Sequence, residues 1–238
     1  MLVRYHSYVP SSTIPFFLLA VLTAAIVLTL AWVQAVLAPE EMTRDPLAVA
    51  QLRMNRGLFC CSPFLGAVST LGVLLWAAGA ALGVAGALIL HRLRAGGAGI
   101  ALLALGAALS LWLALDDGFM LHETYPVRAL DVSLWKAVPA LLLAAVAALI
   151  VAARAWAGWT LLGAAAAALA ASLAVDEFAP QTADVIFVED AFKFLGSCLW
   201  AAWFLYKTVD MAVAAAASVP AGRPDAGSVR PASPQPAE

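Results

Sequence analysis

The chain has 238 residues, of which 64% are hydrophobic and only 12% are charged. A soluble domain has roughly 45–50% apolar and about 25% charged residues, so this composition excludes an ordinary soluble fold and indicates a membrane protein. The formal net charge is −2, and no stripe of Lys and Arg runs along the chain, so we expect no nucleic-acid partner.

The first apolar stretch runs from Ile14 to Ala38, after a polar segment of residues 1–13. A transmembrane helix needs about 20 apolar residues, so this stretch predicts a first span, with residues 1–13 in the cytoplasm. The apolar region of a secretory signal has only about 7–15 residues. We therefore expect the first helix to be uncleaved.

The hydrophilic loop 39–62 predicts one short helix, at about residues 46–56. Asp45 suits the capping position before this helix, Pro46 suits its first turn, and Gly57 favours its end. Its two arginines are typical of an amphipathic helix that lies in the membrane interface. A helix in a solvated loop is the alternative.

Five more apolar runs predict five more transmembrane helices, at about residues 63–90, 97–117, 135–153, 155–175 and 184–206. With the first helix they form an all-α, six-helix transmembrane domain over residues 14–210 of a polytopic membrane protein. Residues 218–238 are rich in Pro, Ala, Gly and Ser and have no apolar periodicity. We expect them to form a disordered C-terminal tail.

One face of the second predicted helix carries four glycines at helical spacing: Gly72, Gly79, Gly83 and Gly86. Small residues at such positions let helix backbones approach closely in a bilayer. We therefore expect the Gly-rich faces to pack against other helices, against a partner membrane protein or against a second copy of the chain.

Two stretches of the chain resemble each other, residues 94–119 and residues 154–178. With one gap in the alignment, both begin with Arg-Ala, contain Leu-Leu and Gly-Ala-Ala, and end in an acidic pair and then Phe. Lys136 and Lys193 then fall at similar places in the next helix. The pattern predicts tandem two-helix repeats, which occur in membrane folds. A chance match between two Ala- and Leu-rich segments is the alternative.

The turns after the second and fourth helices carry Arg92, Arg94 and Arg154 and contain no acid. By the positive-inside rule these turns are cytoplasmic, with both termini on the same side of the membrane. The Ala-rich helices and basic turns are typical of a bacterial inner membrane, so we expect a plasma-membrane location. The acidic helix ends then lie at the outer face. Three arginines of the first outer loop oppose this orientation: Arg44, Arg53 and Arg56.

Acidic residues at the helix ends carry most of the possible chemistry. Asp117 shares a helix face with Gly106 and Ser110, and Asp176 shares a face with Ser172, so we expect both carboxylates to face the bundle. A charge at a helix centre in the bilayer costs about 2.5–3.5 kcal/mol. Clustered carboxylates therefore need a proton, a cation or a basic partner such as Lys193, which follows Glu189 by four residues.

Carboxylates and imidazoles are also metal ligands, and five such residues gather at the predicted outer face: Asp117, His122, Glu123, Asp176 and Glu189. They predict a divalent Zn, Mn or Fe ion, which would activate a bound water for hydrolysis. The candidate catalytic residues are Asp117, Glu123, Asp176 and Glu189, with Lys193 as electrostatic stabiliser. The spacing Asp-Asp-x4-His-Glu is not a specific motif and lacks the paired histidines of His-Glu-x-x-His sites.

Three functions are compatible with these residues. The first is a metal-dependent enzyme that acts on a lipid or another membrane-associated substrate. The second is a cation- or proton-coupled transporter or channel, although the predicted helices place no ionisable residue deep in the membrane. The third is a non-catalytic subunit of a membrane assembly. We expect four other acids to be solvated or in local ion pairs: Asp116, Asp131, Asp184 and Asp190.

Overall fold

The computed structural model describes residues 12–34, 37–58, 62–119, 132–152, 158–180 and 182–218; within 132–152 it describes the side chains of 141–151. All regular structure in these segments is helical. The predicted disordered tail, Cys60 and Cys61, the loop 120–131 and most of the N-terminal polar segment lie outside the described residues.

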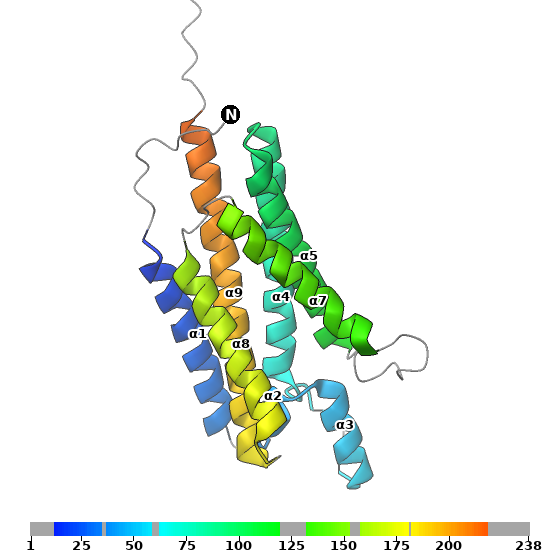
Figure 1. Cartoon of the computed structure of the whole chain (residues 1–238). Coiled ribbons are helices and arrows are strands. Elements are labelled where there is room, and N and C mark those ends of the chain that lie inside the picture. Colours follow the sequence, from blue (N-terminus) through cyan, green and yellow to red (C-terminus); the bar gives the residue numbers. More distant parts are fainter. Residues whose placement is uncertain are drawn as a thin grey trace, which may run out of the picture.

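Six long helices form the body of the molecule (Figure 1). They are α1 (Ile14–Val33), α4 (Ala67–Arg92), α5 (Gly97–Phe119), α7 (Val132–Ala152), α8 (Trp159–Phe178) and α9 (Ala183–Ala217). Successive long helices run in opposite directions, so α1, α5 and α8 end where α4 and α9 begin. The short helices α2 (Pro39–Thr43) and α3 (Pro46–Asn55) lie at that same end.

Four of these helices, α1, α4, α5 and α8, are long and apolar enough to cross a membrane. The outer face of α1 shows the pattern most clearly, because Leu18, Leu22, Ile26 and Leu30 are each more than half exposed. A water-soluble surface rarely carries so continuous an apolar face. The chain is therefore a membrane protein by the length and composition of its helices.

The longest helix, α9, is the core of the bundle and contacts α1, α2, α4, α5 and α8. Its buried aromatic residues pack against one another, with ring centroids 5.8 Å apart for Trp200 and Trp203 and 4.9 Å apart for Trp203 and Phe204. These rings occupy the space that small residues leave on the neighbouring helices. A β-carbon added to Gly83 or Gly106 would lie within 3 Å of the Phe204 ring.

The predicted glycine face of α4 packs inside the chain. Gly79, Gly83 and Gly86 are buried against α5 and α9. This contact is the close approach that small residues permit between helices in a bilayer. A contact with a second copy of the chain would need a different face.

The sixth predicted helix is longer than its sequence pattern indicated. We predicted an end at about residue 206, but α9 continues to Ala217. Lys207 and Asp210 are therefore within the helix, and their exposed fractions are only 2% and 8%. Their opposite charges interact across one turn. The pattern of apolar residues alone underestimated the length of α9, and it therefore did not predict that this buried charged turn belongs to the helix.

Candidate functional site

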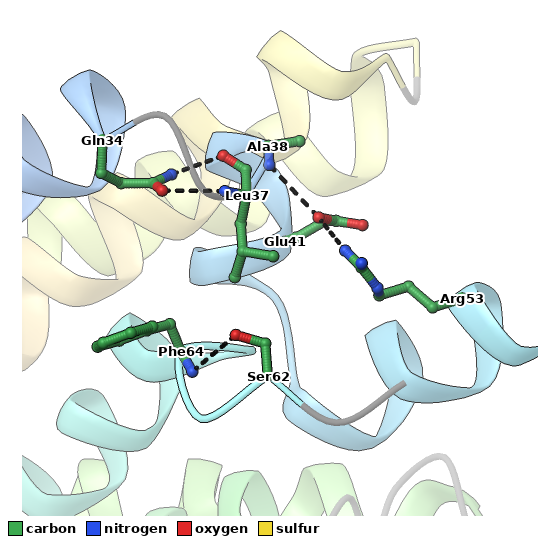
Figure 2. Close-up of polar contacts among 7 residues, drawn as sticks. All are labelled: Gln34, Leu37, Ala38, Glu41, Arg53, Ser62 and Phe64. Carbon is green, nitrogen blue, oxygen red and sulfur yellow. Dashed lines mark hydrogen bonds and ion pairs between the residues drawn. The ribbon is translucent and has the colours of Figure 1, made fainter. Parts of the chain in front are cut away.

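Hydrogen bonds and an ion pair organise the residues on both sides of α2, between the end of α1 and α3 (Figure 2). The side-chain amide of Gln34 donates to the carbonyl of Leu37 at 2.6 Å and accepts from its N–H at 3.0 Å. Glu41 accepts a hydrogen bond from the N–H of Ala38 at 3.3 Å and forms an ion pair with Arg53 at 2.8 Å. These contacts fix α2 against α3.

The corner between α2 and α3, residues 43–46, lies over the start of α4. The N–H of Gly66 donates to the carbonyl of Glu41 at 2.9 Å. Gly66 has a φ of 61°, and a β-carbon added there would clash with the ring of Pro46. Glycine tolerates both conditions because it has no β-carbon. The sequence therefore brings the corner into direct contact with the bundle.

Asp45 lies at this corner and binds α4. It occupies the position before the first residue of α3, as predicted, but its side chain makes no capping hydrogen bond. Oδ1 of Asp45 instead accepts a hydrogen bond from the hydroxyl of Ser69 at 3.0 Å. The predicted capping interaction was wrong because a tertiary partner, which the local pattern does not reveal, takes its place.

An ion pair between α5 and α9 forms the centre of the site. Nζ of Lys193 lies 3.0 Å from Oδ1 of Asp117, and their side chains are 38% and 14% exposed. The second oxygen of Asp117 accepts a hydrogen bond from the indole N–H of Trp76 at 3.2 Å. The expectations that Asp117 faces the bundle and that Lys193 is a basic partner of the acids agree with this geometry. Three helices are joined through one carboxylate.

Asp190 lies one turn before Lys193 on α9 and contributes another carboxylate. The hydroxyl of Thr43 hydrogen-bonds to this carboxylate. Its Oδ2 is buried and has no hydrogen-bond partner among the described residues. Of the two expectations for Asp190, solvation is wrong for Oδ2, which the protein covers, and a local charge partner is present in Lys193, with which Asp190 interacts electrostatically. A buried acceptor without a partner costs about 1–3 kcal/mol or more, so it calls for an explanation.

These side chains surround a polar cavity of about 30 Å³, referred to below as the polar cavity. Its charged lining residues are Asp45, Asp117, Asp190 and Lys193, together with the hydroxyls of Thr43, Ser69 and Ser197. A polar cavity of this size is large enough for one water molecule or one small ion. Three carboxylates thus face a single ammonium group across a space that can hold one more small group.

Further charges lie close to the polar cavity. Glu189 is partly buried, and it interacts electrostatically with Asp176, Asp190, Lys193 and Arg44. Even with Arg44 included, acids outnumber basic groups in this region. The surroundings are therefore negative overall, and they favour a cation or a proton.

Asp176 does not lie in the polar cavity. The face of α8 that carries Ala165 and Ser172 is buried, as predicted, but the carboxylate at its end is exposed. The expectation that Asp176 faces the bundle was wrong because the buried stripe of α8 stops about one turn before the helix ends.

The five predicted metal ligands are not assembled within the described residues. Asp117 has both oxygens engaged, and Asp176 lies outside the polar cavity. His122 and Glu123 are outside the described residues. In the part of the chain that the structure describes, no group of three His, Cys, Asp or Glu side chains is positioned to hold a metal. A metal centre that includes the loop 120–131 stays a prediction.

Sequence reasoning found Asp117 and Lys193 but missed several other residues of the site. Trp76 lies between Gly72 and Gly79 on the packing face of α4, so its spacing could have pointed to the interior. Thr43 and Ser69 gave no such signal. Their role depends on how the corner between α2 and α3 folds back onto the bundle.

The chain matches one protein family, described as a domain of unknown function (DUF8692), over residues 16–206. The chain belongs to this family. The matched region includes all the residues of the polar cavity. No curated protein and no solved structure matches the chain.

Proposed function

We propose that this protein is a six-span membrane protein that binds a small cation, or a proton in its place, in the polar cavity at its outer face. The observation that carries the proposal is the buried, unpartnered Oδ2 of Asp190 in a cavity of about 30 Å³. The proposal corresponds to a cation- or proton-coupled transporter rather than to a metal-dependent enzyme.

The charge balance of the polar cavity supports a positive occupant. Lys193 is within electrostatic range of Asp45, Asp117 and Asp190, so one ammonium group faces three carboxylates. Burying like charges together is unfavourable unless an opposite charge or a proton compensates them. A small cation coordinated by Asp190 and the neighbouring hydroxyls would supply that compensation, and so would a proton on Asp190.

The arrangement of the helices supports six spans in a plasma membrane. Helices α7 and α9 run between the same two ends of the bundle as the four apolar helices (Figure 1). Lys193 lines the polar cavity and Lys207 is buried inside the chain, so α9 can cross the lipid despite its charges. Arg92 and Arg94 lie at the end opposite the polar cavity, which favours a cytoplasmic location for that end and for both termini.

The position of the corner between α2 and α3 suggests how binding is coupled to a conformational change. Thr43 and Asp45 belong to the corner, whereas Asp117, Asp190 and Lys193 belong to the bundle. An occupant that contacts both groups favours the conformation in which the corner lies against α4 and α9. Loss of the occupant leaves repelling carboxylates across this contact and favours its opening. Such a difference in affinity between two states is what coupled transport requires.

The proposal can be tested by the thermal stability of the purified protein in detergent. At pH 8 and constant ionic strength, sodium, potassium and calcium chlorides are each compared with choline chloride, because choline is too large for the polar cavity. We expect one of the small cations to raise the melting temperature of the wild type. The Asp190→Asn variant should lose this increase, and the Asp176→Asn variant, altered outside the polar cavity, should keep it.

A proton as the occupant gives a different result in the same experiment. None of the cations then raises the melting temperature, but acidification in choline chloride does so in the wild type and not in Asp190→Asn. The proposal is wrong if the two proteins respond identically to every cation and to pH.

A further inference from the structure

An apolar groove of about 410 Å³ runs along the seam between α4 and α5, away from the polar cavity. Half of its ten lining residues are alanines, among them Ala80, Ala104 and Ala108. Their short side chains leave a depression where leucines would fill the seam. His91 is the one polar side chain in the lining, and it lies at one end of the groove.

The length of the groove corresponds to one leaflet of a bilayer. Along α4 the groove extends from Ala80 to His91. These eleven steps of about 1.5 Å span about 16 Å. The hydrocarbon core of a bilayer is about 30 Å thick, so the groove covers about half of it, starting from one membrane face.

The end of the groove at His91 is basic. Arg92 and Arg94 follow in the same turn, and all three side chains are exposed. Residues 91–96 contain no Asp or Glu. Basic side chains at the edge of a membrane attract anionic lipid headgroups. The groove is one leaflet long, apolar along its length and basic at one end. It therefore complements a single anionic phospholipid, which has an apolar acyl chain and a negatively charged headgroup.

We propose that the groove binds one acyl chain of an anionic phospholipid, with the lipid phosphate beside His91 and Arg92. Ordinary surrounding lipid contacts every exposed apolar face. The groove differs because it combines a depth made by alanines with charge complementarity at one end. The lipid would lie in the leaflet opposite to the polar cavity, and its binding does not depend on the cation proposed there.

The test is native mass spectrometry of the full chain released from nanodiscs of phosphatidylglycerol and phosphatidylcholine in equal amounts. We expect the wild type to retain one phosphatidylglycerol. The variant Ala104→Leu with Ala108→Leu fills the groove and should retain it at least fivefold less often. The matched control, Ala166→Leu with Ala170→Leu, places the same pair on the exposed face of α8 and should behave as the wild type does.

The contact proposed between the lipid headgroup and the basic side chains is tested separately. The variant His91→Gln with Arg92→Gln should lose the preference for phosphatidylglycerol over phosphatidylcholine, whereas Arg56→Gln at the opposite end of the bundle should keep it. The proposal is overturned if the wild type retains no lipid, or if the groove-filling variant retains as much lipid as the control. It is also overturned if filling the groove dissociates an oligomer without changing the bound lipid, since a second copy would then occupy the groove.

Discussion

Helices α5 and α8 end in nearly the same sequence but in different surroundings. Both carry a face of small residues that leads to an acidic pair and then Phe, with Gly118 inserted before the Phe of α5. At the end of α5, Asp117 is 14% exposed and forms an ion pair with Lys193. At the end of α8, Asp176 is exposed. The stripe of small residues therefore determines how closely a helix packs, and the neighbouring helices determine whether its terminal carboxylate becomes part of a site.

The difference depends on what the neighbours contribute. Near Asp117, α4 provides an indole N–H and α9 provides an ammonium group. Asp176 has another acid, Glu189, within electrostatic range. Two like charges are most stable where water screens them. The ends of the two similar stretches therefore lie in different surroundings, because Asp117 is partly buried beside an indole and an ammonium group and Asp176 is exposed beside an acid.

Removing the ammonium group that pairs with Asp117 at the end of α5 should reduce the stability of the protein the most. Lys193→Met leaves Asp45, Asp117 and Asp190 around the polar cavity without their ammonium partner. Breaking a buried pair costs about 3–5 kcal/mol and an exposed pair about 1 kcal/mol, so for this partly exposed lysine we expect about 2–3 kcal/mol. The measurement is the melting temperature in detergent at pH 8. The double variant Lys193→Met with Asp117→Asn should recover part of the loss, and equal melting temperatures for the single and double variants would contradict the proposed role of Asp117.

The sequence was sufficient to predict where the long helices lie but not what surrounds each carboxylate. Helical periodicity correctly predicted that Asp117 lies on the packed face of α5, which carries the buried residues Gly106 and Ser110, because there α4 and α9 supply partners for the carboxylate. The burial of Asp190 depends on Thr43, far away in the chain, so no pattern within α9 could indicate it. The exposure of Asp176 was missed for the same reason. Its surroundings come from other helices.

Detaching the corner between α2 and α3 from α4 should reduce stability less than the loss of the Lys193 ammonium group does. Ser69→Ala removes the hydrogen bond to Asp45 and should cost about 1–2 kcal/mol, because a partly buried carboxylate loses a donor. Opening of the corner would loosen α3, in which Arg53 is partly buried in its ion pair with Glu41, and would give trypsin access to the bond after Arg53. We expect faster cleavage there, measured by mass spectrometry of the fragments, than in the matched variant Ser12→Ala, whose serine is exposed near the start of α1. Unchanged cleavage would show that this hydrogen bond does not hold the corner in place.

The smallest effect on stability is expected at Asp176, the exposed carboxylate at the end of α8. Asp176→Asn neutralises an exposed carboxylate, so its effect on the melting temperature at pH 8 should be smaller than that of the two variants above, as for most surface substitutions. Relief of the repulsion between Asp176 and Glu189 offsets part of any loss. The same measurement on Asp117→Asn provides the counterpart, and there we expect a clear decrease. If the two variants lost the same stability, the different surroundings of the two carboxylates would not matter energetically, and the ends of α5 and α8 would have to be treated as equivalent parts of one acidic face.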